Sequence, residues 1–304
     1  MPAFRHIVVG LDTHHATGAL SAGSAAALAC ARWLAHGESV RCTLLHSSSD
    51  DEIFDPSDGK YLTSGDAVPA DAAIEAAVRE LREAGIATRV EISPARAWLA
   101  VIRRVLEAPA DLVIVGKRSE PEEGGPRVGS VAAKLLRKCP SAVWAVRPGS
   151  ESPPRVVLAA CDLTDVGERV IERASQIALR ARAPLHVIHT VQLTMQAQLE
   201  SKREGYLEQQ TQAATRSIRA TLERVGHAGE VALHVGLGSP TRAILAGVER
   251  HRADLVVMGT IARGGVSGLL LGNTAERLLQ RVPASILTVK PADFVCPVEP
   301  DQAR

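Results

Sequence analysis

The sequence predicts an α/β protein of two tandem doubly wound domains, each a five-stranded, mainly parallel sheet with helices on both faces. Three observations lead to this fold class. Apolar segments of strand length, without polar alternation, alternate with helix-length segments along the chain, which is typical of a parallel sheet buried on both sides. The second half of the chain repeats the first. A stretch rich in Pro, Ser and Gly, RPGSESPPR, lies between the halves and reads as a linker.

The repeat is clearest at the end of each half, where 110–148 aligns with 253–291 without a gap. Asp12 also corresponds to Asp162, and the first half then has seven more residues than the second between this aspartate and the next matched position, His46 or His189. Duplication of this kind fixes two copies of one structural unit. The pairs that match 143 residues apart include Gly116 with Gly259, Gly129 with Gly272, and His46 with His189.

The repeat predicts a first domain at 1–149, a second at 153–291 and a C-terminal tail at 292–304. Apolar β-branched runs predict its strands, and alanine-rich or amphipathic runs predict its helices. The elements expected in the first domain are strand 7–11, helix 18–35, a strand ending at His46, helix 70–85, strand 88–92, helix 95–107, strand 112–115, a glycine-containing loop, a helix, and strand 142–146.

The second domain is expected to repeat this order, with one difference after its second strand. The polar segment after His46 predicts a mobile loop or a short irregular insertion. Its counterpart predicts a long amphipathic helix, because Leu207, Ala214, Ile218 and Leu222 recur at helical spacing, as does Val225. The elements expected are strand 156–160, helix 164–182, a strand ending at His189, helix 200–225, strand 231–235, helix 239–250, strand 255–258, a glycine loop, a helix beginning at Asn273, and strand 285–289.

Composition narrows the classes of function. The net charge of +1 and the eight aromatic residues argue against general nucleic-acid or membrane binding and against base-stacking surfaces. The chain has no apolar run of membrane-spanning length and no signal-peptide pattern, so a cytoplasmic protein is expected. An odd number of cysteines without a C-x-x-C predicts reduced, mostly buried thiols rather than a metal cluster; they are Cys30, Cys42, Cys139, Cys161 and Cys296.

Candidate site residues gather where strands end. Ligands of parallel α/β sheets bind beyond the carboxyl ends of the strands, and each half ends three strands with a polar residue or glycine. These residues are Asp12, His46 and Gly116 in the first half, and Asp162, His189 and Gly259 in the second. In the second half a loop with five glycines then leads into a helix, and such a loop exposes amide groups and a positive helix end to an anion such as phosphate.

These features resemble the universal stress protein family, in particular its tandem bacterial members of the E type. The family signature after strand four is G-x2-G-x9-G-[ST]. The second half offers Gly259-x2-Ala262-x9-Gly272-Asn273, and the first offers Gly116-x2-Ser119-x9-Gly129-Ser130. The resemblance extends from Arg5 to Pro291. It implies two domains packed about a pseudo-two-fold axis, with strands 142–146 and 285–289 pairing as an intramolecular pseudo-dimer, and leaves a homodimer possible.

The resemblance also implies an ATP site, with Mg²⁺ as a possible companion. In nucleotide-binding members the loop amides and the hydroxyl after the last glycine hold the phosphates, and the aspartate ending strand one and the residue after strand two hold adenosine. Ala262 and Asn273 depart from the signature. The residues that this implies in the second half are Asp162, Thr190, Met258, Gly259, Ala262, Arg263, Gly272, Asn273 and Thr274.

The first half implies a weaker second site at Asp12, Gly116, Gly129 and Ser130. Its loop carries glutamates at 120, 122 and 123, and carboxylates repel a triphosphate unless a metal intervenes. The second-half loop carries Arg263 and no acid. A phosphorylated ligand is therefore expected mainly in the C-terminal domain.

Structural roles compete with several of these assignments. His46 and His189 are expected to be hydrogen-bonded structural residues at strand ends. Asp12 and Asp162 either orient a ribose or Mg²⁺ or cap the following helix. His14-His15 lacks a third metal ligand at a recognisable spacing.

No sequence pattern indicates a catalytic residue, a catalytic elbow, a P-loop or a zincin motif. The expected function is a non-enzymatic stress-response and signalling protein that binds ATP or a related phosphorylated ligand and acts on an unknown protein partner. Slow incidental ATP hydrolysis is left open. Two alternatives also stay open: an interaction or scaffold protein that binds no nucleotide, and a carrier of a non-nucleotide ligand, for example a lipid-derived one, near the variable segments.

Overall fold

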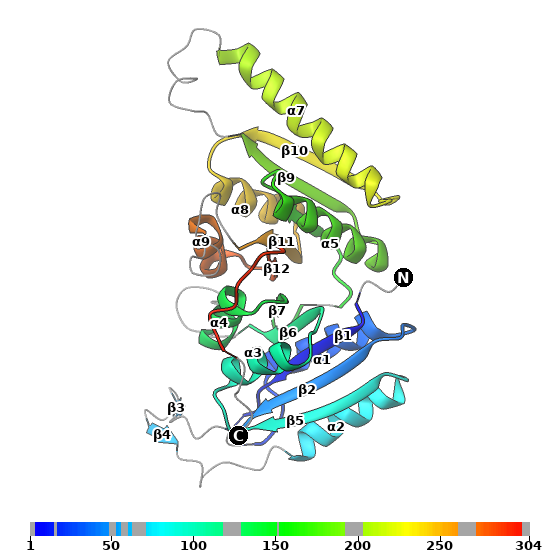
Figure 1. Ribbon diagram of the computed structural model, residues 1–304, viewed down its shortest axis with the longest axis vertical. Helices are drawn as coiled ribbons and strands as arrows, with labels where there is room; N and C mark the ends of the chain where they lie inside the picture. The colour runs from blue at the N-terminus through cyan, green and yellow to red at the C-terminus, as the bar shows by residue number, and fades with distance from the viewer. Residues whose placement is uncertain are drawn as a thin grey trace. The chain divides into compact units, whose positions relative to one another are not determined.

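The computed structural model describes residues 4–14, 17–48, 53–55, 60–62, 71–117, 129–150, 152–191, 203–260 and 272–299. Its internal contacts divide the chain into two compact units (Figure 1). The first is Met1–Ser152 together with Val295–Arg304, and the second is Pro153–Phe294. The C-terminal tail from Val295 on thus belongs to the first unit, where the Cys296 thiol donates to the Lys138 carbonyl at 3.4 Å.

The described strands of the first unit form a parallel sheet in the order β7-β6-β1-β2-β5. Helices α1 and α2 cover one face, and α3 and α4 cover the other. The order in which strands are added to the sheet reverses between β1 and β6. Parallel sheets of this kind bind ligands at such a switch point. The elements are β1 His6–Leu11, α1 Ala22–Ala35, β2 Arg41–Ser47, α2 Asp71–Glu83, β5 Ala87–Ser93, α3 Ala97–Glu107, β6 Leu112–Gly116, α4 Ser130–Lys138 and β7 Ala142–Val146.

The second unit repeats this topology, with its described strands in the parallel order β12-β11-β8-β9-β10. Helices α5 and α7 lie on one face and α8 and α9 on the other (Figure 1). The reversal falls between β8 and β11. The elements are β8 Val157–Ala160, α5 Asp165–Ala181, β9 Leu185–Val191, α7 Arg203–Arg224, β10 Val231–Leu237, α8 Pro240–His251, β11 Leu255–Gly259, α9 Asn273–Arg281 and β12 Ser285–Val289.

The predicted fold class is confirmed, and two local expectations are corrected. The first helix begins at Ala22 rather than near 18, because Thr13 forms a β-bridge with Leu20 and Ser21 then caps the helix. The segment expected to be irregular contains a short antiparallel hairpin of β3 and β4, Ile53–Asp55 and Lys60–Leu62. The expected amphipathic helix is confirmed as α7.

Burial follows the sequence pattern. The central strands of both sheets are buried along almost their whole length. In α7, Ala214, Ile218 and Leu222 are buried at the spacing that predicted the helix. Cys30, Cys42, Cys139 and Cys161 are buried, as expected, and burial raises the pKa of the Cys42 thiol to about 12.

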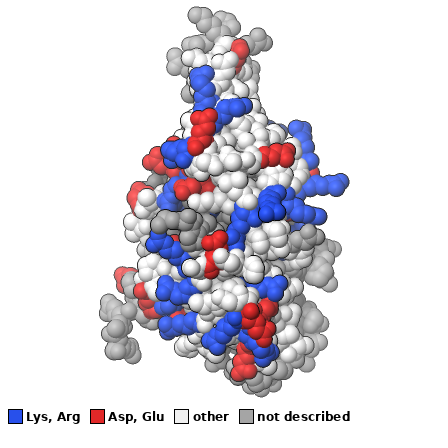
Figure 2. Space-filling model, turned by 90° about the vertical axis from the view of Figure 1, so that its right-hand side faces the viewer, with Lys and Arg blue, Asp and Glu red and all other residues white. Residues whose placement is uncertain are grey.

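The distribution of surface charge and the polarity of the helices agree with the composition. Basic and acidic side chains are interspersed over the face that Figure 2 shows, so the near-zero net charge does not hide a large surface of one sign there. Among the helices that the structure describes, none is both long enough and apolar enough to cross a membrane.

Candidate functional site

A cavity of about 750 Å³ lies at the carboxyl ends of β8, β9 and β11 in the second domain. This size is in the range of sites for small molecules and cofactors. The floor comes from the three strand ends. The walls come from the start of α5, the middle of α7, and the first turns of α8 and α9. The lining residues from the helices include Gly167, Val170, Gln210, Ala213, Ala214, Ser217, Pro240, Ile244, Thr274 and Ala275.

The residues expected to form the C-terminal site converge on this cavity as far as the structure describes them. They come from four separate segments that only the fold brings together. Ala262 and Arg263 lie outside the described residues, and the side chain of Asn273, the first residue of α9, is not described. The expected residues that line the cavity are Asp162, Thr190, Met258, Gly259, Gly272 and Thr274.

Asp162 shapes the turn between β8 and α5. Its Oδ1 accepts hydrogen bonds from the backbone N–H of Thr164 at 3.1 Å and from the Thr164 hydroxyl at 2.6 Å. Thr164 is the residue that caps α5, so the interpretation of Asp162 as the helix cap is wrong. Between the two, Leu163 has φ +60, a left-handed conformation that is uncommon for a leucine. Such strain is concentrated at functional turns, and Leu163 lines the cavity.

The two ends of the glycine loop are joined at the cavity. The backbone N–H of Gly272 donates to the carbonyl of Thr260 at 2.8 Å. Gly272 is also the N-cap of α9 and, as a glycine, supplies no capping side chain. The first amides of a helix have no partner within it, so the positive end of α9 begins at the edge of the cavity.

A buried lysine contacts Thr260, the last described residue before the glycine loop. The Lys290 ammonium group donates to the Thr260 hydroxyl at 2.9 Å and lies 4.9 Å from the centre of the Phe294 ring. Lys290 is only 3% exposed, and Thr260, which lines the cavity, is 2% exposed. Because charge is poorly screened where water is excluded, this ammonium group makes the loop end of the cavity favourable for an anion.

The two strand-end histidines are bound to backbone carbonyls, as expected. His189 Nδ1 donates to the carbonyl of Cys161 at 2.9 Å, and His46 Nδ1 donates to that of Leu11 at 3.2 Å. A carbonyl only accepts, so Nδ1 carries the proton in each ring. These bonds tie strand two to the end of strand one in both domains.

The first-domain counterparts are built differently. Asp12 is exposed, and its backbone N–H donates to the Ser24 hydroxyl. Ser21, not Asp12, caps α1, so the capping interpretation is wrong here too. Gly129 caps α4, and Ser130 is exposed. The loop that holds the three glutamates lies outside the described residues.

Sequence comparison identifies the family. A model of the universal stress protein family matches residues 3–147 and 154–290. The chain belongs to this family. The expected resemblance is therefore confirmed, with both copies of the domain recognised.

Relatives of this universal stress protein have the same tandem organisation. Universal stress protein E of Photorhabdus laumondii is 24% identical over 264 residues, which cover 81% of this chain and 83% of that protein. Universal stress protein E of Escherichia coli K12 is 26% identical over 218 residues, 68% of this chain and 69% of that one. The crystal structure of a functionally unknown protein from Pseudomonas aeruginosa PAO1 superimposes with a TM-score of 0.70 at 25% identity, over 96% of this chain and 94% of that one.

Sequence reasoning missed several residues of this cavity in the universal stress protein. Lys290 and Thr260 were not singled out, although the repeat pairs Thr260 with Lys117 and Lys290 with Arg147. The exchange of a charged residue, Lys117, for a polar one, Thr260, at one matched position was the available signal. The α7 residues that line the cavity carried no such signal, because their inward direction depends on how α7 crosses the sheet.

Proposed function

We propose that the C-terminal domain binds an adenine nucleotide, ATP in the first instance, or a related phosphorylated small molecule in this cavity. Binding would serve signalling rather than turnover. Occupancy would change a surface that a protein partner reads, which requires the ligand to bind one conformation of the protein better than another.

One observation carries the proposal: residues from four segments, selected by a sequence motif, line a single cavity of suitable size. Their chemistry suits the parts of a nucleotide. A carboxylate at Asp162 can accept hydrogen bonds from ribose hydroxyls. The first amides of α9 and the Thr274 hydroxyl can donate to phosphate oxygens.

Charge supports the same orientation of the ligand. The Lys290 ammonium group lies behind Thr260 at the loop end, so phosphates are favoured there and the nucleoside toward Asp162. Glu276, the acidic residue in the first turn of α9, is exposed and does not line the cavity. Its negative charge is therefore screened by water.

A second candidate function is a carrier of a non-nucleotide, apolar ligand. Val191 of β9 and Ala213 and Ala214 of α7 give the cavity apolar lining beside the polar Gln210 and Ser217, and α7 belongs to the variable part of the repeat. An acyl or other lipid-derived group would bury more apolar surface against α7 than an adenine ring requires.

The first test is native mass spectrometry of freshly purified protein, followed by calorimetric titration with Mg²⁺–ATP. Gly272→Val is the informative variant. Gly272 has φ −61 and ψ 142, a conformation that valine adopts readily, so the added side chain should fill the site without straining the backbone. Saturable binding to the wild type and its loss in Gly272→Val are expected.

The repeat supplies a matched control in Gly129→Val. Gly129 has φ −61 and ψ 161 and caps α4 as Gly272 caps α9. ATP binding should survive this substitution in the first domain. Loss of binding in both variants, or in neither, would contradict a site in the C-terminal domain. A co-purified ligand of another mass, lost from Gly272→Val, would replace ATP by the carrier function.

The proposal includes three further expectations carried by the sequence. Pairing of the last strands as a pseudo-dimer, a cytoplasmic location and the absence of an enzymatic role are all retained as predictions. Incubation of the protein with Mg²⁺–ATP, with ADP release followed over hours, tests the last of these. Multiple turnovers that Gly272→Val abolishes would contradict it.

A further inference from the structure

Three histidines distant in sequence meet on one face of the second domain, and we call them the histidine cluster. His186 is in β9, His234 is in β10 and His251 is the last residue of α8. In the parallel register His186 lies opposite Ala232. His234, two residues further along β10, therefore points to the same face as His186. Helix α8 packs on this face and ends over the two rings.

The imidazole nitrogens lie close together. His186 Nδ1 and His234 Nε2 are 3.0 Å apart, and one ring nitrogen from each of the three residues lies within 4.8 Å of the others. The ring centre of His251 lies 4.0 Å from that of His186 and 4.7 Å from that of His234. All three residues are partly exposed, so solutes can reach them.

The surroundings favour the neutral form of His186 and His234. Burial, followed by the neighbouring His251 and His234, lowers the pKa of His186 to about 4. Burial, followed by His251 and Arg250, also lowers the pKa of His234. The neutral imidazole is the form that binds metal ions.

We propose that the histidine cluster binds one divalent transition-metal ion of the Zn²⁺ or Ni²⁺ class through one nitrogen of each ring. Imidazole ligands suit these ions. Tetrahedral Zn²⁺ with Zn–N bonds of about 2.0–2.1 Å holds its nitrogens about 3.3 Å apart. The nitrogens of His186 and His234 are already near this spacing. Coordination by all three histidines requires the stacked rings to rotate so that each ring plane contains the ion. The fourth position stays open to water or another small ligand.

This site is separate from the cavity proposed for the phosphorylated ligand. The cavity uses the carboxyl end of β9 and the first turns of α8, at Pro240 and Ile244. The histidine cluster uses the second residue of β9 and the last of α8. At 1.5 Å per residue the two ends of α8 are roughly 10 Å or more apart, so either site can exist without the other.

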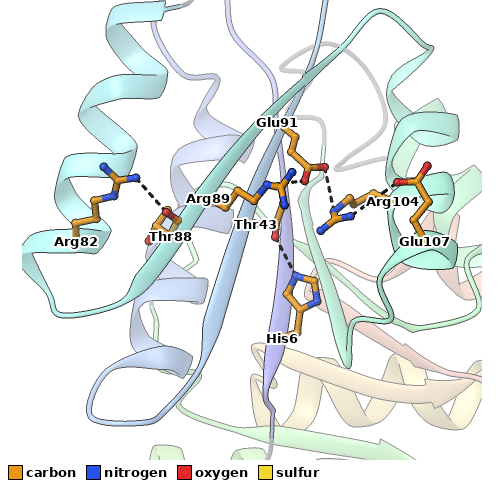
Figure 3. Close-up of polar contacts among 8 residues, drawn as sticks. All are labelled: His6, Thr43, Arg82, Thr88, Arg89, Glu91, Arg104 and Glu107. Carbon is orange, nitrogen blue, oxygen red and sulfur yellow. Dashed lines mark hydrogen bonds and ion pairs between the residues drawn. The ribbon is translucent and has the colours of Figure 1, made fainter.

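The first domain lacks this arrangement at the matched positions. Thr43 corresponds to His186, Glu91 to His234 and Ala108 to His251. Figure 3 shows Thr43 in contact with His6, and Glu91 between Arg89 and Arg104. Two arginines would repel a cation there. The repeat therefore predicts one such site per chain, in the second domain.

The test is Zn²⁺ titration of the full chain without an affinity tag, by calorimetry at pH 7.5. Co²⁺ is used in parallel, because its visible spectrum reports tetrahedral nitrogen coordination. One equivalent is expected to bind the wild type. His234→Gln should weaken binding at least about ten-fold, since even the loss of a residue that only supports a ligand costs 10–100-fold. His36→Gln, at an exposed residue of the first domain, should leave binding unchanged.

Thermal unfolding gives a second readout. Zn²⁺ should raise the unfolding temperature of the wild type and of His36→Gln, because an ion that binds only the folded state stabilises it. It should not raise that of His234→Gln. If His234→Gln fails to fold without metal, His251→Gln at the helix end takes its place. Absence of the one-equivalent binding in the wild type, or equal binding by wild type and the folded cluster variant, would overturn the proposal.

Discussion

The two domains carry different chemistry at matched positions of the sheet edge. In the first domain Glu91 of β5 lies 3.0 Å from Arg104 of α3 and 3.1 Å from Arg89 (Figure 3). In the second domain the position of Glu91 is taken by His234, and that of Arg104 by Gly247. The helix there packs directly on the sheet: a Cβ added to Gly247 would lie 2.4 Å from Ile188 Cδ1. The ion pair of Glu91 and Arg104 in the first domain is thus replaced by His234 and Gly247 in the second. This exchange changes both the helix packing and the chemistry of this edge of the sheet, while the topology is kept.

The strand ends at Gly116 and Gly259 differ as well. In the first domain α1 starts late and its Gly23 packs on Gly116: a Cβ added to Gly116 would lie 2.4 Å from the backbone of Gly23. In the second domain a Cβ added to Gly259 would meet Val166 Cγ1 at 2.8 Å. Gly23 and Val166 occupy matched positions of the repeat, each the second residue of its helix. The exchange of valine for glycine therefore places helix backbone, rather than a side chain, against the strand end of the first domain.

The largest expected effect distinguishes these two glycines. Gly116→Ala should lower the free energy of unfolding by about 3 kcal/mol, because overpacking against backbone cannot be relieved by a rotamer change. Gly259→Ala should cost about 1 kcal/mol, since the valine tip can move. Denaturant midpoints measure the losses, and amide exchange assigns each to its domain. Equal losses would show that the close contact of Gly23 and Gly116 is not a constraint.

Acid should destabilise the second domain before the first. The pKa of His186 is about 4 in the folded protein, below its ordinary value near 6.5. The unfolded chain therefore takes up the proton first, and stability is lost as pH falls from about 6.5 toward 4. The loss is about 2 kcal/mol at most, because water reaches part of the rings and screens the interaction.

Amide exchange of the two domains at pH 7 and pH 4.5, in chelator, measures this difference. His186→Gln should flatten the pH dependence of the second domain and leave the first unchanged. His6 is the corresponding group to watch in the first domain, since burial lowers its pKa too. A second domain that gains protection on acidification would contradict the assigned direction.

The smallest expected effect concerns the ion pairs in Figure 3. Glu91→Gln should cost about 1 kcal/mol, because Arg104 is only 15% exposed and keeps just the longer contact to Glu107 at 3.8 Å. Arg89→Gln should change stability by less than about 0.5 kcal/mol, since Arg89 is 69% exposed. Urea unfolding of both variants tests the ranking. A larger loss in Arg89→Gln would reverse the importance of the two pairs.

Much of the fold could be predicted from periodicity and repetition. The last strand of each domain lies at the expected residues, Ala142–Val146 and Ser285–Val289. Strand ends and the glycine motif also pointed to Asp162, Gly259 and Gly272, which line the cavity, but not to the residues that α7 contributes. These features are local or repeated, so their pattern is present in the sequence without knowledge of contacts.

Other features depend on contacts that no short window contains. The late start of α1 follows from the Thr13–Leu20 bridge, and the position of Lys290 behind Thr260 follows from the β11–β12 pairing. The sequence by itself determined two α/β repeats and, in each, a glycine motif that begins at the carboxyl end of a strand. Only the tertiary structure decided which residues share a site. The histidine cluster shows why: strand register and the crossing of α8 bring together side chains that lie far apart along the chain.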